Sequence, residues 1–485
     1  MTEFELKFQV PPERAAGVEA ALRRGTVHRE RLRASYFDTP DHALARNGLV
    51  LRVRQEGRAR VQTAKGPGRG GFERLEHNVP LAKGEERPDP ARHSVHPVGK
   101  ALRDALDGHE GELQPMFDTD VVRRSRVLRT AGTAVEIALD QGHIRANGSS
   151  VPVLELELEL KEGSAGALVE LAQRWCEEHG LWLDPLTKSG AGWRLADGVT
   201  QPRPVSAGEV HEADGRSHLL AQILDVGLQQ ALGNARELAA GTGGDDHIHQ
   251  LRVGLRRVRS AVRELAHWSP LLAAAAPAIE VPLKATFRLL GEHRDRSTLL
   301  PGLREELGAH GAPLADWDAP LPDVGAAVRE PAFQQALLQL VALVHELSDI
   351  DDGGLKSARQ DACDRLQKLH RKALRKGHGF VQLAQPERHQ VRKRLKRLRY
   401  LSELVRPLFD GDAVDRYVKS LKDLQDALGH YQDAAAGRQL FEEHAREDAR
   451  AWFGAGWLAS REEQLAHACE DACRRTERKV RRFWK

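Results

Sequence analysis

The sequence predicts an α+β protein of two domains: an N-terminal antiparallel β-barrel tunnel with covering helices, and a C-terminal all-α domain of two duplicated helical bundles. Three observations predict this architecture. Segments before residue 200 alternate charged and apolar residues with the period of a β-strand. Segments after residue 215 are rich in Ala, Leu, Arg, Gln and Glu with helical spacing. The helical part also contains an internal repeat.

The predicted limits are residues 1–200 for the barrel, 201–215 for a linker and 216–485 for the helical domain. The linker is rich in Pro, Gly and short polar residues, a composition that is typical of a connection without secondary structure. A chain of 485 residues is long enough to give both domains a substantial core.

The first predicted strand has one charged face. Glu3, Glu5 and Lys7 point to one side, whereas Phe4 and Leu6 point to the other. Two carboxylates about 7 Å apart along a strand can share a divalent cation, and Mg²⁺ or Mn²⁺ prefers such oxygen ligands. Because this alternation is also typical of a solvated edge strand, the segment alone does not decide between the two interpretations.

The same spacing recurs in later segments, which favours the metal site. Charged residues occur two positions apart at Arg52 and Arg54, Arg74 and Glu76, and Arg124 and Arg126. Glu155, Glu157 and Glu159 share one face of segment 154–161, and stacked carboxylates repel one another unless cations lie opposite. A closed barrel supplies that opposition, because its charged faces line a common lumen. Further charges in this lumen are expected from Lys65, Glu136, Asp140 and Lys188.

These motifs resemble the CYTH superfamily, also called triphosphate tunnel metalloenzymes, over about residues 1–198. The ExExK signature of the family is matched by Glu3, Glu5 and Lys7, and its acidic late strand by residues 155–161. The other matches follow in the family's order: Arg52 and Arg54, Thr63 and Lys65, Arg74 and Glu76, and the basic pair Arg124 and Arg126. The closing segment keeps Lys188 but lacks the arginine that often follows it in relatives.

The resemblance implies metal-dependent phosphoanhydride hydrolysis and assigns roles to the charged residues. Ligands for Mg²⁺ or Mn²⁺ are expected among Glu3, Glu5, Glu136, Glu155, Glu157 and Glu159. The expected catalytic residues, which hold metal or phosphate, are Glu3, Glu5, Lys7, Arg52, Arg54, Lys65, Arg74, Glu76, Arg124 and Arg126. For Glu76, Glu136 and Glu155, a structural ion pair is an equal alternative.

The helical part repeats a basic segment. Residues 249–259 align without a gap to residues 389–399 at an offset of about 140 residues. Residues 290–295 likewise pair with residues 428–433 at nearly the same offset. Two helical bundles related by duplication are the simplest architecture for this pattern.

Each repeated segment predicts a helix with a basic stripe, which we define as His249, Arg252, Arg256 and Arg259 in the first repeat and His389, Arg392, Lys396 and Arg399 in the second. Each stripe falls within an arc of roughly 80° at about 100° per residue, beside an apolar arc. Neighbouring cations lie closer than the screening length of roughly 8 Å. They therefore need acidic neighbours or a polyanion, either polyphosphate or, less favoured, the phosphate backbone of a nucleic acid.

The helical part resembles the CHAD domain over about residues 216–485, and that family is associated with polyphosphate binding. Both His-Gln-x-Arg helices and both LG-x-x-x-D segments, at 290–295 and 428–433, carry the resemblance. The chain departs from the family after Asp295, where Arg296, Ser297 and Thr298 replace the usual apolar residue and second Asp.

The predicted function is divalent-metal-dependent hydrolysis of inorganic triphosphate or short polyphosphate, with a helical domain that binds polyphosphate. Only 5% of the residues are aromatic, which favours a bare phosphate chain over thiamine triphosphate or a nucleotide. A non-catalytic polyphosphate-binding or granule-associated scaffold is the alternative from another class. Four cysteines without framework spacing predict reduced thiols in the cytoplasm. The sequence shows neither a signal peptide nor a membrane-spanning apolar run, so no membrane partner is expected.

Overall fold

The computed structural model describes residues 1–485 except 1, 69, 83, 131, 212 and 314–319. Two compact units make up the chain, and each draws on separate stretches of sequence. The first comprises residues 1–208, 225–254 and 325–346, and the second comprises residues 209–224, 255–324 and 347–485. Two stretches from beyond the predicted linker therefore belong to the same compact unit as the N-terminal sheet.

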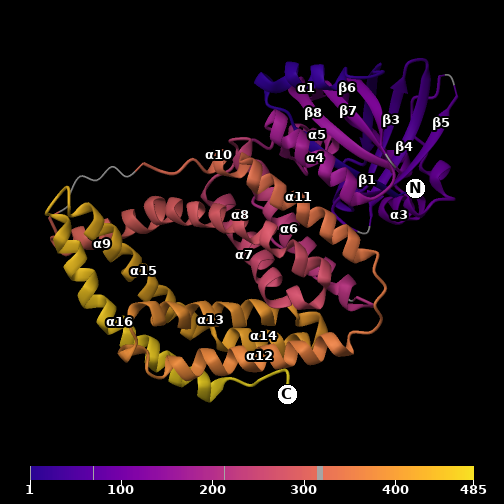
Figure 1. Ribbon diagram of the computed structural model, residues 1–485. Coiled ribbons are helices and arrows are strands. Elements are labelled where there is room, and N and C mark those ends of the chain that lie inside the picture. Colours follow the sequence, from indigo (N-terminus) through magenta and orange to yellow (C-terminus); the bar gives the residue numbers. More distant parts are fainter. Residues whose placement is uncertain (1, 69, 83, 131, 212, 314–319) are drawn as a thin grey trace. The chain divides into compact units, whose positions relative to one another are not determined.

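The first unit contains a closed antiparallel β-barrel, as predicted (Figure 1). Its strands are β1 (Thr2–Gln9), β2 (His28–Asp38), β3 (Val50–Glu56), β4 (Ala59–Pro67), β5 (Glu73–Leu81), β6 (Gln114–Thr130), β7 (Thr133–Ala146) and β8 (Ser149–Glu162). They pair in the order β5-β4-β3-β2-β6-β7-β8-β1, and pairing of β5 with β1 closes the barrel. The short β9 (Trp182–Leu183) adds to β1.

The predicted alternation of charged and apolar faces is present in β1 and β8. Glu5 lies opposite Glu159, and Lys7 lies opposite Glu157. Leu6 and Leu158 on the other face are fully buried. Strand β8 is packed against α4 (Ala165–His179), whose N-terminus is capped by a hydrogen bond from the Ala167 backbone N–H to the Ser164 hydroxyl. The other helices of this part are α1 (Ala15–Leu22), α2 (Ala43–Arg46), α3 (Pro97–Leu106) and α5 (Lys188–Ala196).

An apolar core fills one end of the barrel. Its buried residues include Tyr36, Phe117, Ile144 and Val153, and the apolar side of α5 packs against them. At Gly192 in α5, a Cβ atom would lie 2.2 Å from the Phe117 ring, so a side chain there would prevent this close approach. Along β8, Val153 belongs to this core and Glu155, Glu157 and Glu159 follow it. The charged residues are therefore displaced toward the other end of the barrel.

The chain beyond the linker is helical, as predicted. Its α-helices are α6 (Arg216–Ala239), α7 (Asp245–Leu265), α8 (Pro270–Arg294), α9 (Leu300–Ala309), α10 (Val324–Arg329), α11 (Pro331–Ser348), α12 (Lys356–Gly377), α13 (Gln385–Leu404), α14 (Gly411–Ser420), α15 (Lys422–His444) and α16 (Ala451–Lys479). No helix in the described ranges is both long and apolar enough to cross a lipid bilayer.

The two repeated segments form equivalent helices. The first basic stripe lies on α7 and the second on α13. Their apolar arcs are buried as predicted, including Leu251 and Leu255 on α7 and Leu395 and Leu398 on α13. The departure from the CHAD pattern after Asp295 coincides with a π-helical turn, Asp295–Leu299, between α8 and α9. Such turns are uncommon and widen a helix locally.

Candidate active site

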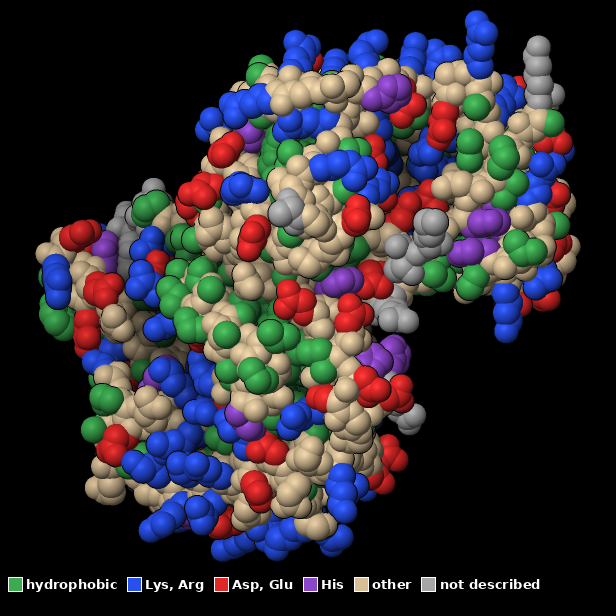
Figure 2. All heavy atoms as spheres, turned by 45° about the vertical axis from the view of Figure 1, so that its right-hand side comes forward, with side chains coloured by type: hydrophobic (Ala, Val, Ile, Leu, Met, Phe, Trp, Pro, Cys, Tyr) green, Lys and Arg blue, Asp and Glu red, His purple; other side chains and the backbone are tan. Residues whose placement is uncertain are grey.

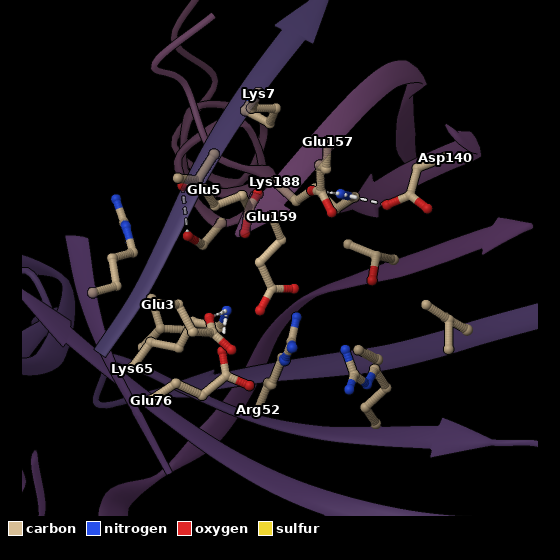
Figure 3. A pocket seen from close by; sticks show the side chains of 18 of the residues that line it. Glu3, Glu5, Lys7, Arg52, Lys65, Glu76, Asp140, Glu157, Glu159 and Lys188 are labelled. Carbon is tan, nitrogen blue, oxygen red and sulfur yellow. Dashed lines mark hydrogen bonds and ion pairs between the residues drawn. The ribbon is translucent and has the colours of Figure 1, made fainter. Parts of the chain in front are cut away.

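A charged cavity of about 420 Å³ lies inside the barrel. Its wall contains thirteen of the residues that the sequence predicted for the lumen: Glu3, Glu5, Lys7, Arg52, Arg54, Lys65, Arg74, Glu76, Glu136, Asp140, Glu157, Glu159 and Lys188. Figure 3 shows Glu3, Glu159 and Arg52 projecting toward a common space, whereas Lys188 reaches toward Glu157 and Asp140. In the space-filling view, blue and red side chains crowd around a hollow in the surface (Figure 2). The strands thus bring together residues that are far apart in the sequence.

Three carboxylates form a row across adjacent strands. Glu5 of β1 is the register partner of Glu159 of β8, which is in turn the partner of Glu136 of β7. Directly opposed residues have Cβ atoms about 5 Å apart, so three negative charges in a row repel one another strongly. Lys161 forms ion pairs with Glu159 at 2.6 Å and with Glu136 at 3.1 Å. This lysine compensates the charges of Glu159 and Glu136 but does not compensate the charge of Glu5 at the end of the row.

The Glu5 carboxyl has an unusual proton affinity. Its burial, followed by the nearby negative charge of Glu157, raises the pKa of Glu5 to about 7. Among the described residues, no Lys or Arg forms an ion pair with it. A second cation beside this row would lower that pKa and stabilise the ionised form. The donor set of oxygen atoms suits a hard divalent ion such as Mg²⁺ or Mn²⁺.

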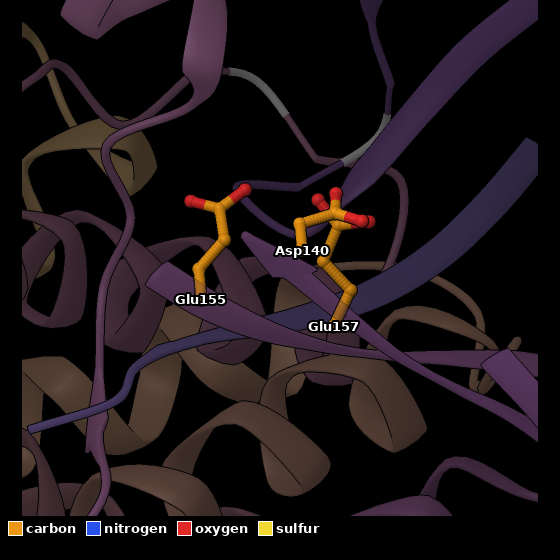
Figure 4. Close-up of side chains that lie close together, drawn as sticks. All are labelled: Asp140, Glu155 and Glu157. Atoms are coloured by element: carbon orange, nitrogen blue, oxygen red, sulfur yellow. The ribbon is translucent and has the colours of Figure 1, made fainter. Parts of the chain in front are cut away.

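A second acidic group surrounds Lys188 at the start of α5. Asp140, Glu155 and Glu157 each offer a carboxylate oxygen within 4.8 Å of the others (Figure 4). Lys188 Nζ forms ion pairs with all three, at 2.6 Å to Asp140 and 2.6 Å to Glu157. The hydroxyl of Thr187 accepts a hydrogen bond from the Gly190 backbone N–H and thereby fixes the first turn of the helix. An internal cation therefore occupies the centre of this group.

The charges of this group shift its carboxyl pKa values in different directions. Burial raises the pKa of Glu155, although Lys188 and Lys7 partly oppose that effect. Burial would also raise the pKa of Glu157, but the charges of Arg123 and Lys188 hold it well below its usual value. Lys7 Nζ lies 3.3 Å from Glu155, which does not line the main cavity. The structure thus gives Glu155 an ion-pair environment.

Lys65 connects two strands on the opposite wall. Its Nζ lies 3.2 Å from Glu3 and also forms an ion pair with Glu76 (Figure 3). Burial would raise the pKa of Glu76, but Lys65 and Arg52 lower it to about 2. Arg52 is further held by a 3.3 Å hydrogen bond from its Nη1 to the Tyr36 hydroxyl. Glu76 is consequently ionised at neutral pH, forms an ion pair with Lys65 and, through its charge, opposes the effect of burial on the pKa of Arg52.

The predicted direction of Arg124 and Arg126 is corrected by the structure. Arg124 pairs with Glu19 of α1 at 3.3 Å, and Arg126 donates a hydrogen bond to the backbone carbonyl of Arg24. Neither lines the cavity, whereas the neighbouring Arg123 does. Arg123 forms hydrogen bonds to Asp140 and also contacts Glu157. Both faces of this strand carry arginine, so alternation alone could not fix which face turns inward.

The sequence pattern did not predict a role for two other lysines that line the cavity, Lys161 and Lys188. Lys161 is the last residue of the acidic motif, and Lys188 was recognised only as a further cation without a role. Their lining positions could have been predicted from charge balance, because Lys161 forms ion pairs with Glu136 and Glu159, and Lys188 forms ion pairs with Asp140, Glu155 and Glu157.

The basic stripes are partly compensated within the helices. On α7, Arg259 pairs with Glu280 at 2.9 Å, and Arg256 donates a 2.6 Å hydrogen bond to the Tyr400 hydroxyl. On α13, Arg399 pairs with Glu403 at 2.8 Å. Burial lowers the pKa of Arg392, and its Nε atom has no hydrogen-bond partner among the described residues. The other stripe residues lie on the same two helices, with His389 contacting Gln432 at 2.9 Å.

Comparison with known proteins supports two successive domains. The CYTH domain family matches residues 1–189, and the CHAD domain family matches residues 222–442. An inorganic triphosphatase of Haemophilus influenzae is 28% identical over 201 residues, which are 40% of this chain and 55% of that relative, about half its length. An uncharacterized protein of Mycobacterium tuberculosis is 27% identical over 532 residues, covering 99% of this chain and 97% of the relative.

Two solved structures are similar to parts of the chain. A CHAD domain from the plant Ricinus communis is 23% identical, covers 57% of this chain and 98% of its own, and has a TM-score of 0.46. A Hippeastrum protein, described as an adenylyl cyclase with a dominant triphosphatase activity, is 17% identical, covers 41% and 98%, and has a TM-score of 0.30. From the family matches, the chain consists of a CYTH domain at residues 1–189 followed by a CHAD domain at residues 222–442.

Proposed function

We propose that the barrel hydrolyses inorganic triphosphate or a short linear polyphosphate with the help of a divalent metal ion. The observation that carries this proposal is a closed lumen lined by a row of carboxylates on one side and by arginines and lysines on the other. A metal complex of a linear polyphosphate presents both charges at once. The named inorganic triphosphatase relative supports the same reaction class at the level of the domain.

The metal ligands in this proposal are Glu3, Glu5, Glu157 and Glu159, with Mg²⁺ or Mn²⁺ as the ion. When bound, the ion would neutralise phosphate oxygens and acidify a water molecule. Glu136 has a supporting role through Lys161, and Glu155 holds Lys7 and Lys188 in place.

The cations of the lumen bind and align the phosphate chain. Arg52, Arg54, Arg74 and Arg123 line the cavity, and arginine offers directional donors that match phosphate oxygens. Lys65 is kept charged and in position by Glu3 and Glu76. Since phosphoanhydrides resist attack because of their own negative charge, neutralisation and alignment supply most of the catalysis.

The apolar core at one end of the barrel supports entry of a chain terminus. Tyr36 belongs both to the cavity wall and to the core against which α5 packs. A phosphate chain therefore meets an apolar barrier after passing the charged residues. This arrangement favours short chains, or the ends of long ones, over attack in the middle of a polymer.

For the helical region we propose polyphosphate binding through the basic stripes of α7 and α13. Figure 2 shows Lys and Arg side chains gathered on the surface of the helical part. Association with polyphosphate granules would follow from such binding. The cysteines Cys176, Cys469 and Cys473 are free and buried, which supports the predicted reducing, cytoplasmic location.

The decisive experiment measures phosphate release from triphosphate by the full chain with Mg²⁺, Mn²⁺ or EDTA. Turnover that requires the divalent ion is the expected result. Binding of triphosphate without turnover would favour the non-catalytic scaffold instead. The Glu5→Gln variant distinguishes this site from a contaminating phosphatase, because only the site described here loses activity.

A second candidate substrate is an organic triphosphate. It is favoured by one observation: Leu32, Ala34, Val50 and Val121 give the cavity an apolar section beside Tyr36. An organic group could lie there while the phosphates contact the cations. Comparing kcat/KM for triphosphate, thiamine triphosphate and ATP under the same conditions separates the candidates, and we expect inorganic triphosphate to be preferred.

A further inference from the structure

Strands β1 and β5 close the barrel along a short seam, with cavity-lining side chains on its inner side. Three residue pairs join the strands: Thr2 with Leu75, Glu3 with Arg74, and Phe4 with Glu73. By comparison, thirteen pairs join β7 and β8. Segments with few ladder contacts open locally at lower free energy than well-paired ones. The pairing of β1 with β5 is therefore expected to open more easily than the pairing of β7 with β8, unless other contacts stabilise it.

One side chain of α11 bridges this seam on its outer side. His345 Nδ1 donates a hydrogen bond to Glu73 Oε1 at 2.9 Å. The His345 ring also packs on the Phe4 ring, with centroids 4.4 Å apart and an interplanar angle of 31°. Phe4 and Glu73 are register partners, so His345 contacts both strands at the same rung. The segment of α11 that carries His345 belongs to the first compact unit.

Helix α6 holds the chain immediately before the seam. Burial raises the pKa of Asp225 in α6, and interactions with Gln229 and with the Gly71 backbone partly oppose that effect. A Cβ atom at Gly71 would lie 1.9 Å from the side-chain amide of Gln229, so a side chain at position 71 would require this amide to move. Gly71 and Phe72 line the cavity, and the Phe72 carbonyl accepts a 3.4 Å hydrogen bond from the Glu5 N–H.

A second residue of α11 supports the far end of β1. The Leu183 backbone N–H of β9 donates a 2.8 Å hydrogen bond to Gln334 Oε1. Leu183 pairs with Phe8 of β1, and Gln334 is almost fully buried. Strand β1, which carries Glu3 and Glu5, is thus supported by α11 near both of its ends.

We propose that His345 is a positioning residue of the tunnel, which acts by holding β1 and β5 in register. On the inner side of the seam, Lys65 lies between Glu3 of β1 and Glu76 of β5. Separation of the strands would move Glu3 and Glu5 away from this lysine and from Glu76. The proposal rests on the proposed function for its catalytic consequence, whereas its effect on metal binding and strand opening can be measured without turnover.

Two substitutions in the full chain separate the two contacts of His345. His345→Phe keeps a ring against Phe4 but removes the hydrogen bond from His345 to Glu73, and His345→Gln keeps a donor but loses the ring contact. Glu346→Gln, at the exposed next position of the same helix, is the matched control. We expect both His345 variants to bind Mn²⁺ about tenfold more weakly, the effect typical of residues that orient metal ligands, and the control to bind normally.

Hydrogen exchange supplies the readout that a general loss of stability would not reproduce. Amides of residues 2–6 and 73–75 should exchange about tenfold faster in both His345 variants, whereas amides of β7 and β8 should be unchanged. The double variant His345→Phe with Glu73→Gln is compared with its two single variants. It should bind Mn²⁺ about as well as the single variant of lower affinity, because both substitutions break the same contact. At saturating Mn²⁺, the kcat of the His345 variants should return toward the wild-type value, although their apparent affinity for Mn²⁺ stays lower.

Normal Mn²⁺ binding and normal exchange at the seam in both His345 variants would overturn the proposal. Equal acceleration of exchange across all barrel strands would overturn it as well, because His345 would then support the fold as a whole. If the wild-type chain binds Mn²⁺ but does not hydrolyse triphosphate, the proposed function fails while the exchange and Mn²⁺ measurements still decide the role of His345.

Discussion

The barrel lumen and the basic stripes of α7 and α13 both concentrate charge, but they are left incomplete in opposite ways. In the lumen, Lys65, Lys161 and Lys188 each form ion pairs with two or more carboxylates. The row of Glu5, Glu159 and Glu136 contains more negative charge than Lys161 compensates. On α13, burial lowers the pKa of Arg392, whose Nε has no hydrogen-bond partner in the part of the chain that the structure describes. The first arrangement is completed by a cation and the second by an anion. The difference teaches that one chain can bind phosphate chains by two separate kinds of interaction.

The largest expected effect comes from removing the charge at the Glu5 end of the row. Glu5→Gln should reduce kcat/KM for triphosphate by about 10³-fold, because the variant loses a metal ligand whose contribution is electrostatic. The fold should persist, since the opposite face of β1 is apolar and unchanged. Steady-state kinetics with a melting curve checks both statements. Glu162→Gln, at the exposed end of β8, is the control, and equal activity of the two variants at low Mg²⁺ would contradict the metal site.

The next effect tests the corrected direction of β6. Arg123→Ala should lower kcat/KM by about 10²-fold, because the structure places this guanidinium in the lumen beside Asp140 and Glu157. Arg124→Ala should stay within about twofold of wild type, as expected for a surface substitution, because Arg124 contacts Glu19 on the outer side. Kinetics of both variants at several substrate concentrations decides between them. A larger loss in Arg124→Ala would restore the register predicted from the sequence.

The third effect concerns the helical region and its dependence on salt. Replacing His389, Arg392, Lys396 and Arg399 by Gln should weaken binding of long-chain polyphosphate by about tenfold at low salt and flatten its salt dependence. No divalent ion should be required, because these cations are fixed in the chain. Binding isotherms at several salt concentrations, with EDTA present, give the measurement.

A charge-matched control makes this third test specific. Arg474, Arg475, Arg478 and Lys479 are exposed at the end of α16, and their replacement by Gln removes a similar number of charges elsewhere. Equal loss in the control would mean that overall charge, and not the stripe, binds polyphosphate. Equal affinity of the wild-type chain for duplex DNA and polyphosphate at the same salt would favour nucleic acid as the partner.

Much of the barrel could be predicted from the sequence, because the alternation of charged and apolar residues and the short motifs do not depend on how the strands pair. Glu3, Glu5, Lys65 and Glu76 line the cavity as their motifs indicated. The predicted direction of the β6 side chains was wrong. Arginine occurs on both faces of this strand, and only the pairing of Arg123 with Asp140 shows which face lies inside the barrel. The seam contact of His345 could not be predicted either, since it joins residues 272 positions apart by tertiary packing.

The smallest expected effect is the pH dependence that Glu5 gives to the metal-free protein. Because its folded pKa, about 7, exceeds its usual value of 4.5, folding disfavours the charged form. Its contribution to stability is therefore fully present below about pH 4.5 and is lost as the pH rises through about 7.

Relative to wild type in EDTA, Glu5→Gln should be no more stable at pH 4.5 but more stable at pH 8, by on the order of 1 to 2 kcal/mol after allowance for solvent in the cavity. Denaturant unfolding of both proteins at the two pH values measures this difference, and titrating groups that do not interact with Glu5 cancel in the comparison. Saturating Mn²⁺ should reverse the order at pH 8, because the ion stabilises the ionised carboxylate only in the wild-type chain. If wild type and variant keep the same difference at both pH values and in Mn²⁺, Glu5 is neither the titrating group nor a ligand of the ion.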